Sequence, residues 1–215
     1  AMESRGLGDV YKRQANAVIN GQADASMGSS VSSIFNKTNA SPRGLFFPPM
    51  PHNDEAGWKR AIATAPHFAK AVVTNFIGSS DSNKSFEGMN YPYPIFVTME
   101  KTSEDLSYHL TEAVMENYDQ FKDSGPGMDG YQLSNQNFSW IFPYHPGAVK
   151  YYKKKGVWTS KHDKHNANLI KRQDILAKAW QKTLKANLSG DTFKKKWLEN
   201  RASALKSAGM PNAYN

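Results

Sequence analysis

The stretch Phe142-Pro-Tyr-His-Pro-Gly-Ala-Val-Lys-Tyr-Tyr-Lys-Lys-Lys-Gly-Val-Trp158 is the most informative segment of this chain. Proline is favoured in the first turn of a helix and glycine just beyond its last turn. We therefore expect a short helix through His145–Tyr152 that ends at Gly156. Tyr144 and His145 are expected to hold the Pro-Gly turn and to pack against the aromatic residues that follow.

Further helices are expected on both sides of this segment. The pattern around 57–65 predicts a helix with Trp58, Ile62 and Ala65 on one face. Thr102-Ser-Glu-Asp105 resembles a capping box and predicts a helix start. The apolar face expected for that helix consists of Leu106, Leu110, Ala113, Val114 and Phe121. Helical spacing continues from 165 to 188, and Gly190 separates this segment from a final helix carrying Phe193, Trp197 and Leu205.

Three short strands are predicted, which makes the chain α/β. Residues 15–25 are compatible with a helix end and a strand that enters a serine-rich loop. Leu45-Phe-Phe47 is a short apolar run stopped by two prolines, and it predicts a buried strand end. Ile95-Phe-Val-Thr98 has strong strand propensity. Alternating helices and strands with short connections predict layered α/β packing.

Several segments together resemble one family, the TAXI-type solute receptors of TRAP transporters. Besides the segment 142–158, the similar segments are Asn20-Gly-Gln-Ala-Asp-Ala25, Ser26-Met-Gly-Ser-Ser-Val-Ser-Ser33, Ala40-Ser-Pro-Arg-Gly-Leu-Phe-Phe47, Glu55-Ala-Gly-Trp-Lys59, Ala65-Pro-His-Phe68 and Tyr91-Pro-Tyr-Pro-Ile-Phe-Val-Thr98. Their order and spacing carry the resemblance, which covers nearly everything from Ala15 onward. It implies an extracytoplasmic, periplasmic receptor that captures a small organic acid or related polar solute and delivers it to TRAP membrane permease subunits.

The resemblance also implies an architecture, a partial clamshell of the periplasmic-binding-protein type II class with a helical C-terminal tail. Residues 15–94 are expected in the second lobe, 95–158 in the return toward the first lobe, and 159–215 in a basic helical segment. Ser4-Arg-Gly-Leu-Gly-Asp-Val-Tyr-Lys-Arg-Gln14 resembles a translated sequencing adapter, so 1–14 are expected to be non-native. We then expect a receptor lacking its first half, with exposed apolar surface that leads to self-association or marginal stability.

Solute-binding residues are expected where hydroxyl and amide groups meet aromatic walls. Ser29, Ser30 and Ser32 lie in the serine-rich loop, and Asn75 follows an apolar run. Tyr91 and Tyr93 are the candidate aromatic walls. Two alternatives remain open, because the loop serines also suit a helix N-cap and the tyrosines also suit core packing.

The charge is concentrated at the C-terminal end. Residues 150–215 contain 16 Lys and Arg against four Asp and Glu, whereas the first 149 residues carry a net charge of −4. A basic block of this kind binds nucleic acid or acidic membrane surfaces, or forms a solvated helical face. The lysines alternate with apolar residues, which favours the solvated face. A basic nucleic-acid-binding module is kept as the alternative function, and we expect no nucleic-acid partner.

Motifs for catalysis and metal binding are weak. His162 and His165 are spaced for one helix face, but no third ligand is apparent nearby. The serines lack the Gly-x-Ser-x-Gly frame of a nucleophile elbow. A hydrolase that uses Ser29 or His162 would require these side chains to converge with a base. We therefore expect no enzyme, no metal and no cofactor. The chain has no cysteine, so disulfides are excluded.

Overall fold

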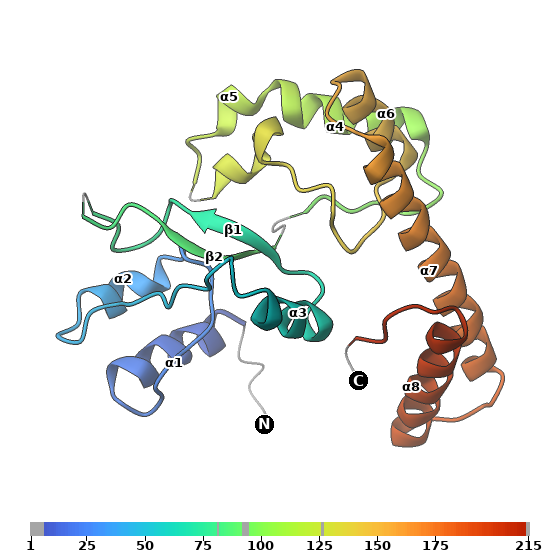
Figure 1. Ribbon diagram of the computed structural model, residues 1–215, viewed down its shortest axis with the longest axis horizontal. Coiled ribbons are helices and arrows are strands. Elements are labelled where there is room, and N and C mark those ends of the chain that lie inside the picture. The colour runs from blue at the N-terminus through green and yellow to red at the C-terminus, as the bar shows by residue number, and fades with distance from the viewer. Residues whose placement is uncertain (1–6, 81, 92–94, 126, 214–215) are drawn as a thin grey trace. The chain divides into compact units, whose positions relative to one another are not determined.

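The computed structural model describes residues 7–80, 82–91, 95–125 and 127–213, with the side chains of 7–12 omitted. It forms a helix-rich chain with one two-stranded sheet (Figure 1). The helices are α1 (Leu7–Ile19), α2 (Ile34–Asn39), α3 (Glu55–Thr64), α4 (Glu104–Glu116), α5 (Tyr118–Phe121), α6 (Pro146–Lys154), α7 (Ser160–Leu184) and α8 (Gly190–Ser207). The strands are β1 (Ala69–Val73) and β2 (Phe86–Asn90), and short 3-10 helices cover Met128–Tyr131 and Leu133–Asn135.

The chain divides into two compact units. The first unit comprises 1–54, 70–90 and 121–129, and the second comprises 55–69, 91–120 and 130–215. The first unit contains the sheet, apart from Ala69, together with α1 and α2, which lie against each other (Figure 1). Four phenylalanines from separate segments pack ring to ring in this unit with centroid distances of 5.2–6.2 Å: Phe35, Phe47, Phe76 and Phe86.

The second unit is built around an aromatic core beneath α6. Its buried members are Phe138, Tyr151, Tyr152 and Trp158, with Tyr108 of α4 packed against them. As predicted, α6 begins after His145 and ends before Gly156, whose φ of 71° suits a residue without a Cβ. The side chain of Tyr144 joins the core, packing against Phe138, Tyr152 and Trp158.

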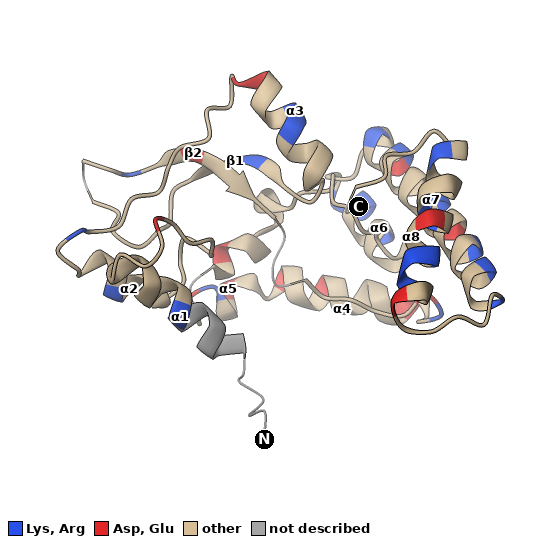
Figure 2. Cartoon of the chain, turned by 90° about the horizontal axis from the view of Figure 1, so that it is seen from below, with Lys and Arg blue, Asp and Glu red and all other residues tan. Residues whose placement is uncertain are grey.

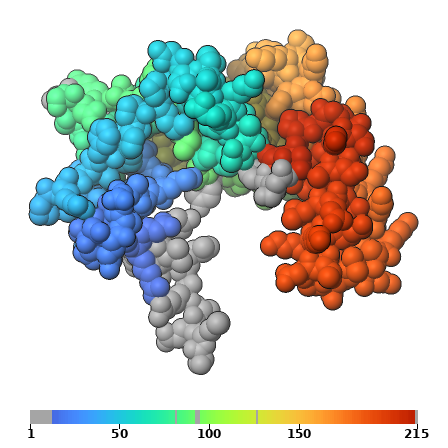
Figure 3. Space-filling view, turned by 60° about the horizontal axis from the view of Figure 1, so that its bottom comes forward, coloured from blue at the N-terminus to red at the C-terminus, as the bar shows by residue number. Residues whose placement is uncertain are grey.

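The expected helices over 57–65 and after 165 are confirmed as α3, α7 and α8. The α7–α8 pair packs through Trp180, whose ring lies 5.2 Å from Phe193 and 5.0 Å from Trp197 between centroids. Leu205 and Thr183 are fully buried in this hairpin. The space-filling view shows the two helices, orange and red, in contact with each other (Figure 3).

Several sequence-based predictions are wrong. Residues 20–25, 45–47 and 95–98 are not strands. Phe47 instead joins the phenylalanine cluster, where it stacks on Phe86 of β2, while Phe46 is exposed. Pro48 and Pro49, which follow the run, cannot donate the backbone hydrogen bonds of a strand pair. Phe96 and Val97 are also exposed.

The alternative that Ser29 or Ser30 caps a helix is wrong for the helix that follows the serine-rich loop. Its first residue is Ile34, and Ser33 rather than Ser29 or Ser30 occupies the N-cap position, without a side-chain capping bond. The helix after Thr102 begins within the predicted segment, but Ser103 rather than Thr102 is its N-cap, and Ser103 Oγ accepts a hydrogen bond from Leu106 N–H at 3.2 Å. Its predicted apolar face is wrong, because Leu106, Leu110 and Ala113 are exposed.

Candidate functional site

The serine-rich loop lies against the segment that follows β1. The Ser30 hydroxyl donates to the Asn75 carbonyl oxygen at 3.1 Å, and the Ile77 N–H donates to the Ser30 carbonyl oxygen at 2.9 Å. Phe76, between these two partners, is buried in the phenylalanine cluster. The structure therefore joins two predicted site residues that are 45 positions apart in sequence.

Three polar side chains beside this junction are available to a ligand. Ser32 N–H donates to the Ser29 carbonyl oxygen at 2.9 Å, so both serines belong to one turn. Among the described residues, the hydroxyls of Ser29 and Ser32 and the side-chain amide of Asn75 have no hydrogen-bond partner. Hydroxyls and amides both donate and accept, so they suit a carboxylate or carbonyl solute. A helix N-terminus does not contribute donors here, since the loop serines do not cap α2.

Of the two tyrosines predicted as aromatic walls, the structure describes only Tyr91. Tyr91 belongs to the second unit, where its ring lies 6.0 Å from His67 and 5.6 Å from Phe68. Its side chain is 41% exposed, so packing does not bury it. Tyr93 lies outside the described residues.

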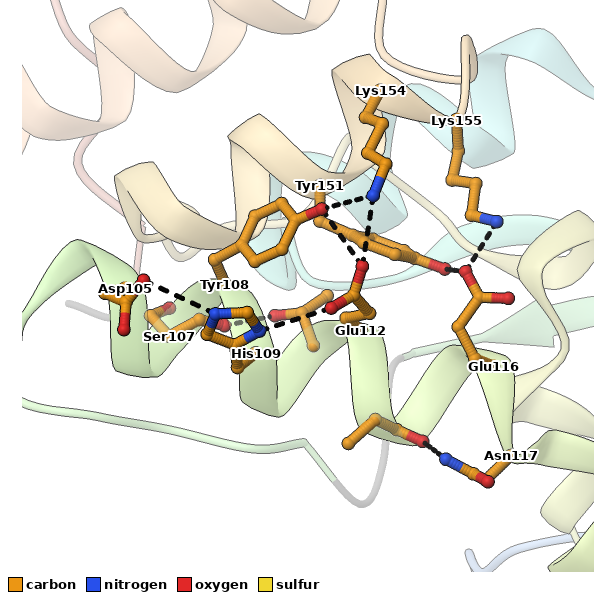
Figure 4. Close-up of polar contacts among 12 residues, drawn as sticks. Asp105, Ser107, Tyr108, His109, Glu112, Glu116, Asn117, Tyr151, Lys154 and Lys155 are labelled. Atoms are coloured by element: carbon orange, nitrogen blue, oxygen red, sulfur yellow. Dashed lines mark hydrogen bonds and ion pairs between the residues drawn. The ribbon is translucent and has the colours of Figure 1, made fainter.

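A second polar cluster joins α4 to α6 (Figure 4). Glu112 accepts hydrogen bonds from the Tyr108 hydroxyl at 3.0 Å and from Lys154 Nζ at 3.2 Å. One turn further along, Glu116 accepts from the Tyr151 hydroxyl at 2.9 Å and pairs with Lys155 Nζ at 2.5 Å. Sequence reasoning missed this cluster, although the four-residue spacing of the two glutamates was a signal that they share a helix face.

The electrostatics of the α4–α6 cluster favour its charged form. Lys154, followed by Tyr108, holds the pKa of Glu112 below its usual value, and Lys155 with Tyr151 does the same for Glu116. Hydrogen bonds to Tyr108 and Glu112 raise the pKa of Lys154. With every charged group of this cluster engaged by a partner, the arrangement fixes α6 on α4 and leaves no carboxylate poised as a general acid or base.

The two histidines considered as metal ligands have structural contacts. His162 Nδ1 accepts from Thr159 N–H at 3.1 Å at the start of α7, and its ring packs on Phe138 and Trp158. His165 Nε2 lies 2.6 Å from the Trp140 carbonyl oxygen and donates to it. Within the described part of the chain, no group of three His, Cys, Asp or Glu residues is arranged to hold a metal.

Comparison with known proteins identifies the class of protein. Residues 7–156, more than half of the chain, match the NMT1-like family, which is a solute-binding-protein-like family. The chain therefore belongs to the NMT1-like family, and this membership indicates an extracytoplasmic solute-binding role. No curated protein and no solved structure gave a significant match. None of the described helices is long and apolar enough to cross a bilayer.

Proposed function

We propose that this chain is the solute-binding subunit of a TRAP-type transporter of the TAXI family, with a clamshell architecture in the periplasm. It captures a small organic acid or a related polar solute by lobe closure, delivers it to the TRAP membrane permease subunits, and catalyses no reaction. The match of residues 7–156 to the NMT1-like family carries this proposal, because it includes the serine-rich loop, Asn75 and the Pro-Gly segment before α6.

The geometry supports a binding role at the serine-rich loop. Hydroxyl groups at Ser29 and Ser32 and an amide at Asn75 lie on segments held together by the Ser30 hydrogen bond. The buried phenylalanine cluster anchors Phe76, immediately after Asn75, so the donors sit on a fixed support. Preorganised donors lower the ordering cost of capturing a small solute. Tyr91 and Tyr93 remain the proposed aromatic walls of the binding site, and the proposal needs no metal or cofactor.

The test is a binding measurement with a panel of small organic acids and amino acids. Native mass spectrometry of the purified protein first identifies a retained or captured solute, and isothermal titration calorimetry then measures its affinity. The triple variant S29A/N75A/S32A removes three hydrogen-bonding side chains, each contributing about 1 kcal/mol, so we expect roughly 100-fold weaker binding. This triple variant, like the control variant described next, should retain the helical circular dichroism spectrum of the wild type.

A matched control removes two serines and one asparagine from exposed helix positions, in the variant N168A/S203A/S207A. We expect this control to bind the solute as tightly as the wild type. If no member of the panel binds the wild-type protein, the proposed function is wrong. If the two triple variants bind the solute equally well, the proposed site is wrong. The transport step is tested by measuring ion-gradient-driven uptake of the solute through TRAP membrane subunits in the presence and in the absence of the protein.

A further inference from the structure

The net positive charge of the chain comes from the α7–α8 hairpin. Residues 159–213 contain 12 of the 27 Lys and Arg but only four of the 19 Asp and Glu, which leaves the other residues balanced at 15 of each sign. Figure 2 marks the Lys and Arg positions in blue along both helices. This hairpin begins beyond residue 156, where the family match ends. The net charge of +8 therefore belongs to an element that the solute-binding family does not account for.

Five exposed lysines are aligned along one side of α7 and are called the α7 lysine stripe: Lys164, Lys171, Lys178, Lys182 and Lys185. At about 100° of rotation per residue, these positions fall within roughly 60° of one another around the helix. The rise of 1.5 Å per residue makes the stripe about 30 Å long. Between its first and last members, the only acidic residue in the sequence is Asp174. The stripe is a nearly uninterrupted line of positive charge.

The lysines of the stripe differ from those of the neighbouring helix α6. Each lysine of α6, and Lys155 after it, has a carboxylate partner, as Lys150 has in Glu104 at 3.3 Å and Lys153 has in Asp163 at 2.9 Å. In the described part of the chain, none of the five stripe lysines forms an ion pair. Their charges are not neutralised within the protein and are available to an external anionic surface.

Exposed apolar side chains adjoin one end of the stripe. Leu184, which lies between Lys182 and Lys185 in the sequence, is 44% exposed, and Leu188, in the connection between α7 and α8, is 39% exposed. An open, shallow hollow on α7 is lined by Ala177, Lys178, Gln181, Lys182 and Lys185. Lysines flanking exposed leucines are typical of helices that lie on an anionic bilayer, where the charges meet the headgroups and the apolar groups enter the interface.

We propose that the α7 lysine stripe, with Leu184 and Leu188, docks on an anionic phospholipid bilayer surface. A straight array about 30 Å long suits an extended charged plane better than a small anion. Nucleic acid would satisfy the charges but would leave the exposed leucines without a partner. The extracytoplasmic solute-binding role that the family match indicates is also compatible with a membrane surface as the partner. This docking does not depend on which solute the first unit binds.

The experiment is sedimentation of the full chain with phosphatidylcholine vesicles, with and without about one third phosphatidylglycerol. We expect binding only to the anionic vesicles, and loss of binding at about 0.5 M salt because the charges are screened. Each lysine contributes about fivefold to the affinity, so K171Q/K178Q/K182Q should bind roughly 100-fold more weakly. The charge-matched control K59Q/K101Q/K122Q should bind within about threefold of the wild type. Circular dichroism confirms that both variants fold.

Absence of binding to anionic vesicles, or equal weakening by the two triple variants, would overturn the proposal. The affinity of the protein for a labelled DNA duplex is measured at the same salt concentrations. Tighter binding to DNA than to vesicles would show that the partner of the stripe is nucleic acid and would overturn the membrane proposal. Solute affinity is measured on the same variants and is expected to be unchanged. Vesicle binding without solute binding would therefore contradict only the proposed function, and solute binding without vesicle binding would contradict only this inference.

Discussion

At the scale of single residues, the aromatic core around α6 controls the ionisation of its tyrosines. Burial raises the pKa of Tyr144 to about 12. Burial also raises the pKa of Tyr152, and for Tyr151 the hydrogen bond to Glu116 adds to the effect of burial. A neutral phenol is compatible with this core, whereas a phenolate would have to lose its hydration.

We predict that alkaline pH destabilises the protein through these tyrosines. The pKa of Tyr144 is higher in the folded chain than in the unfolded chain, so its contribution is complete below pH 10 and is lost as the pH rises toward about 12. The slope for one such group reaches about 1.4 kcal/mol per pH unit. Urea unfolding between pH 8 and about 11.5 should show a shallower decline for Tyr144→Phe than for the wild type. Identical slopes would contradict the assignment.

The sequence predicted only one of the two contacts that His145 makes. The sequence indicated that it holds the Pro-Gly turn, and the structure shows that its Nδ1 accepts from Gly147 N–H at 3.2 Å. Because Nδ1 accepts, Nε2 carries the proton and donates to the Thr102 carbonyl oxygen at 3.1 Å. The second bond joins α6 to the segment before α4, and no local pattern could reveal it.

At the scale of elements, the crossing of α4 and α6 depends on Gly147. A Cβ at this position would lie 2.1 Å from the Glu104 carbonyl oxygen and 3.0 Å from the Ser107 Cβ. The two helix backbones therefore approach closely, and α4 buries the small Ser107 rather than its leucines. The sequence-based prediction chose Leu106 and Leu110 because they are large apolar residues at helical spacing. It is wrong because the close crossing requires a small residue at the contact.

We predict that Gly147→Ala strongly destabilises the second unit. The new methyl group would collide with backbone atoms of α4, which cannot move aside as a side chain can. The cost should exceed about 3 kcal/mol in the free energy of unfolding, the upper part of the range for overpacking. The control Gly130→Ala has open space around the added methyl group and should change stability by less than about 1 kcal/mol. Urea denaturation measures both, and a stable Gly147→Ala variant would refute the close approach.

At the scale of the whole molecule, exposed apolar side chains gather in a short stretch of the second unit. Phe96, Val97 and Met99 are 65%, 80% and 79% exposed, and Leu106 of α4 is 61% exposed. Contiguous exposed apolar surface is uncommon in monomers and marks contact sites. The expectation of self-association drawn from the sequence thus has a physical basis in these residues.

We predict concentration-dependent self-association, detectable by sedimentation velocity between about 5 and 200 μM, because burying these side chains in a contact removes apolar surface from water. The variant F96S/V97S/L106S should remain monomeric over this range. The control M27S/F46S/V72S replaces three equally exposed apolar residues of the first unit and should associate like the wild type. A wild-type monomer at every concentration would disprove this prediction.

The sequence by itself determined the helices that begin at Pro146, after Ser103 and at Gly190, because proline, capping serine and glycine act locally on the backbone. It also determined the concentration of charge beyond residue 150. Only the tertiary structure decided that Ser30 meets Asn75, that Phe47 joins a cluster instead of a strand, and that α4 packs through Ser107. These outcomes depend on contacts between distant segments, for which local propensity and periodicity carry no information.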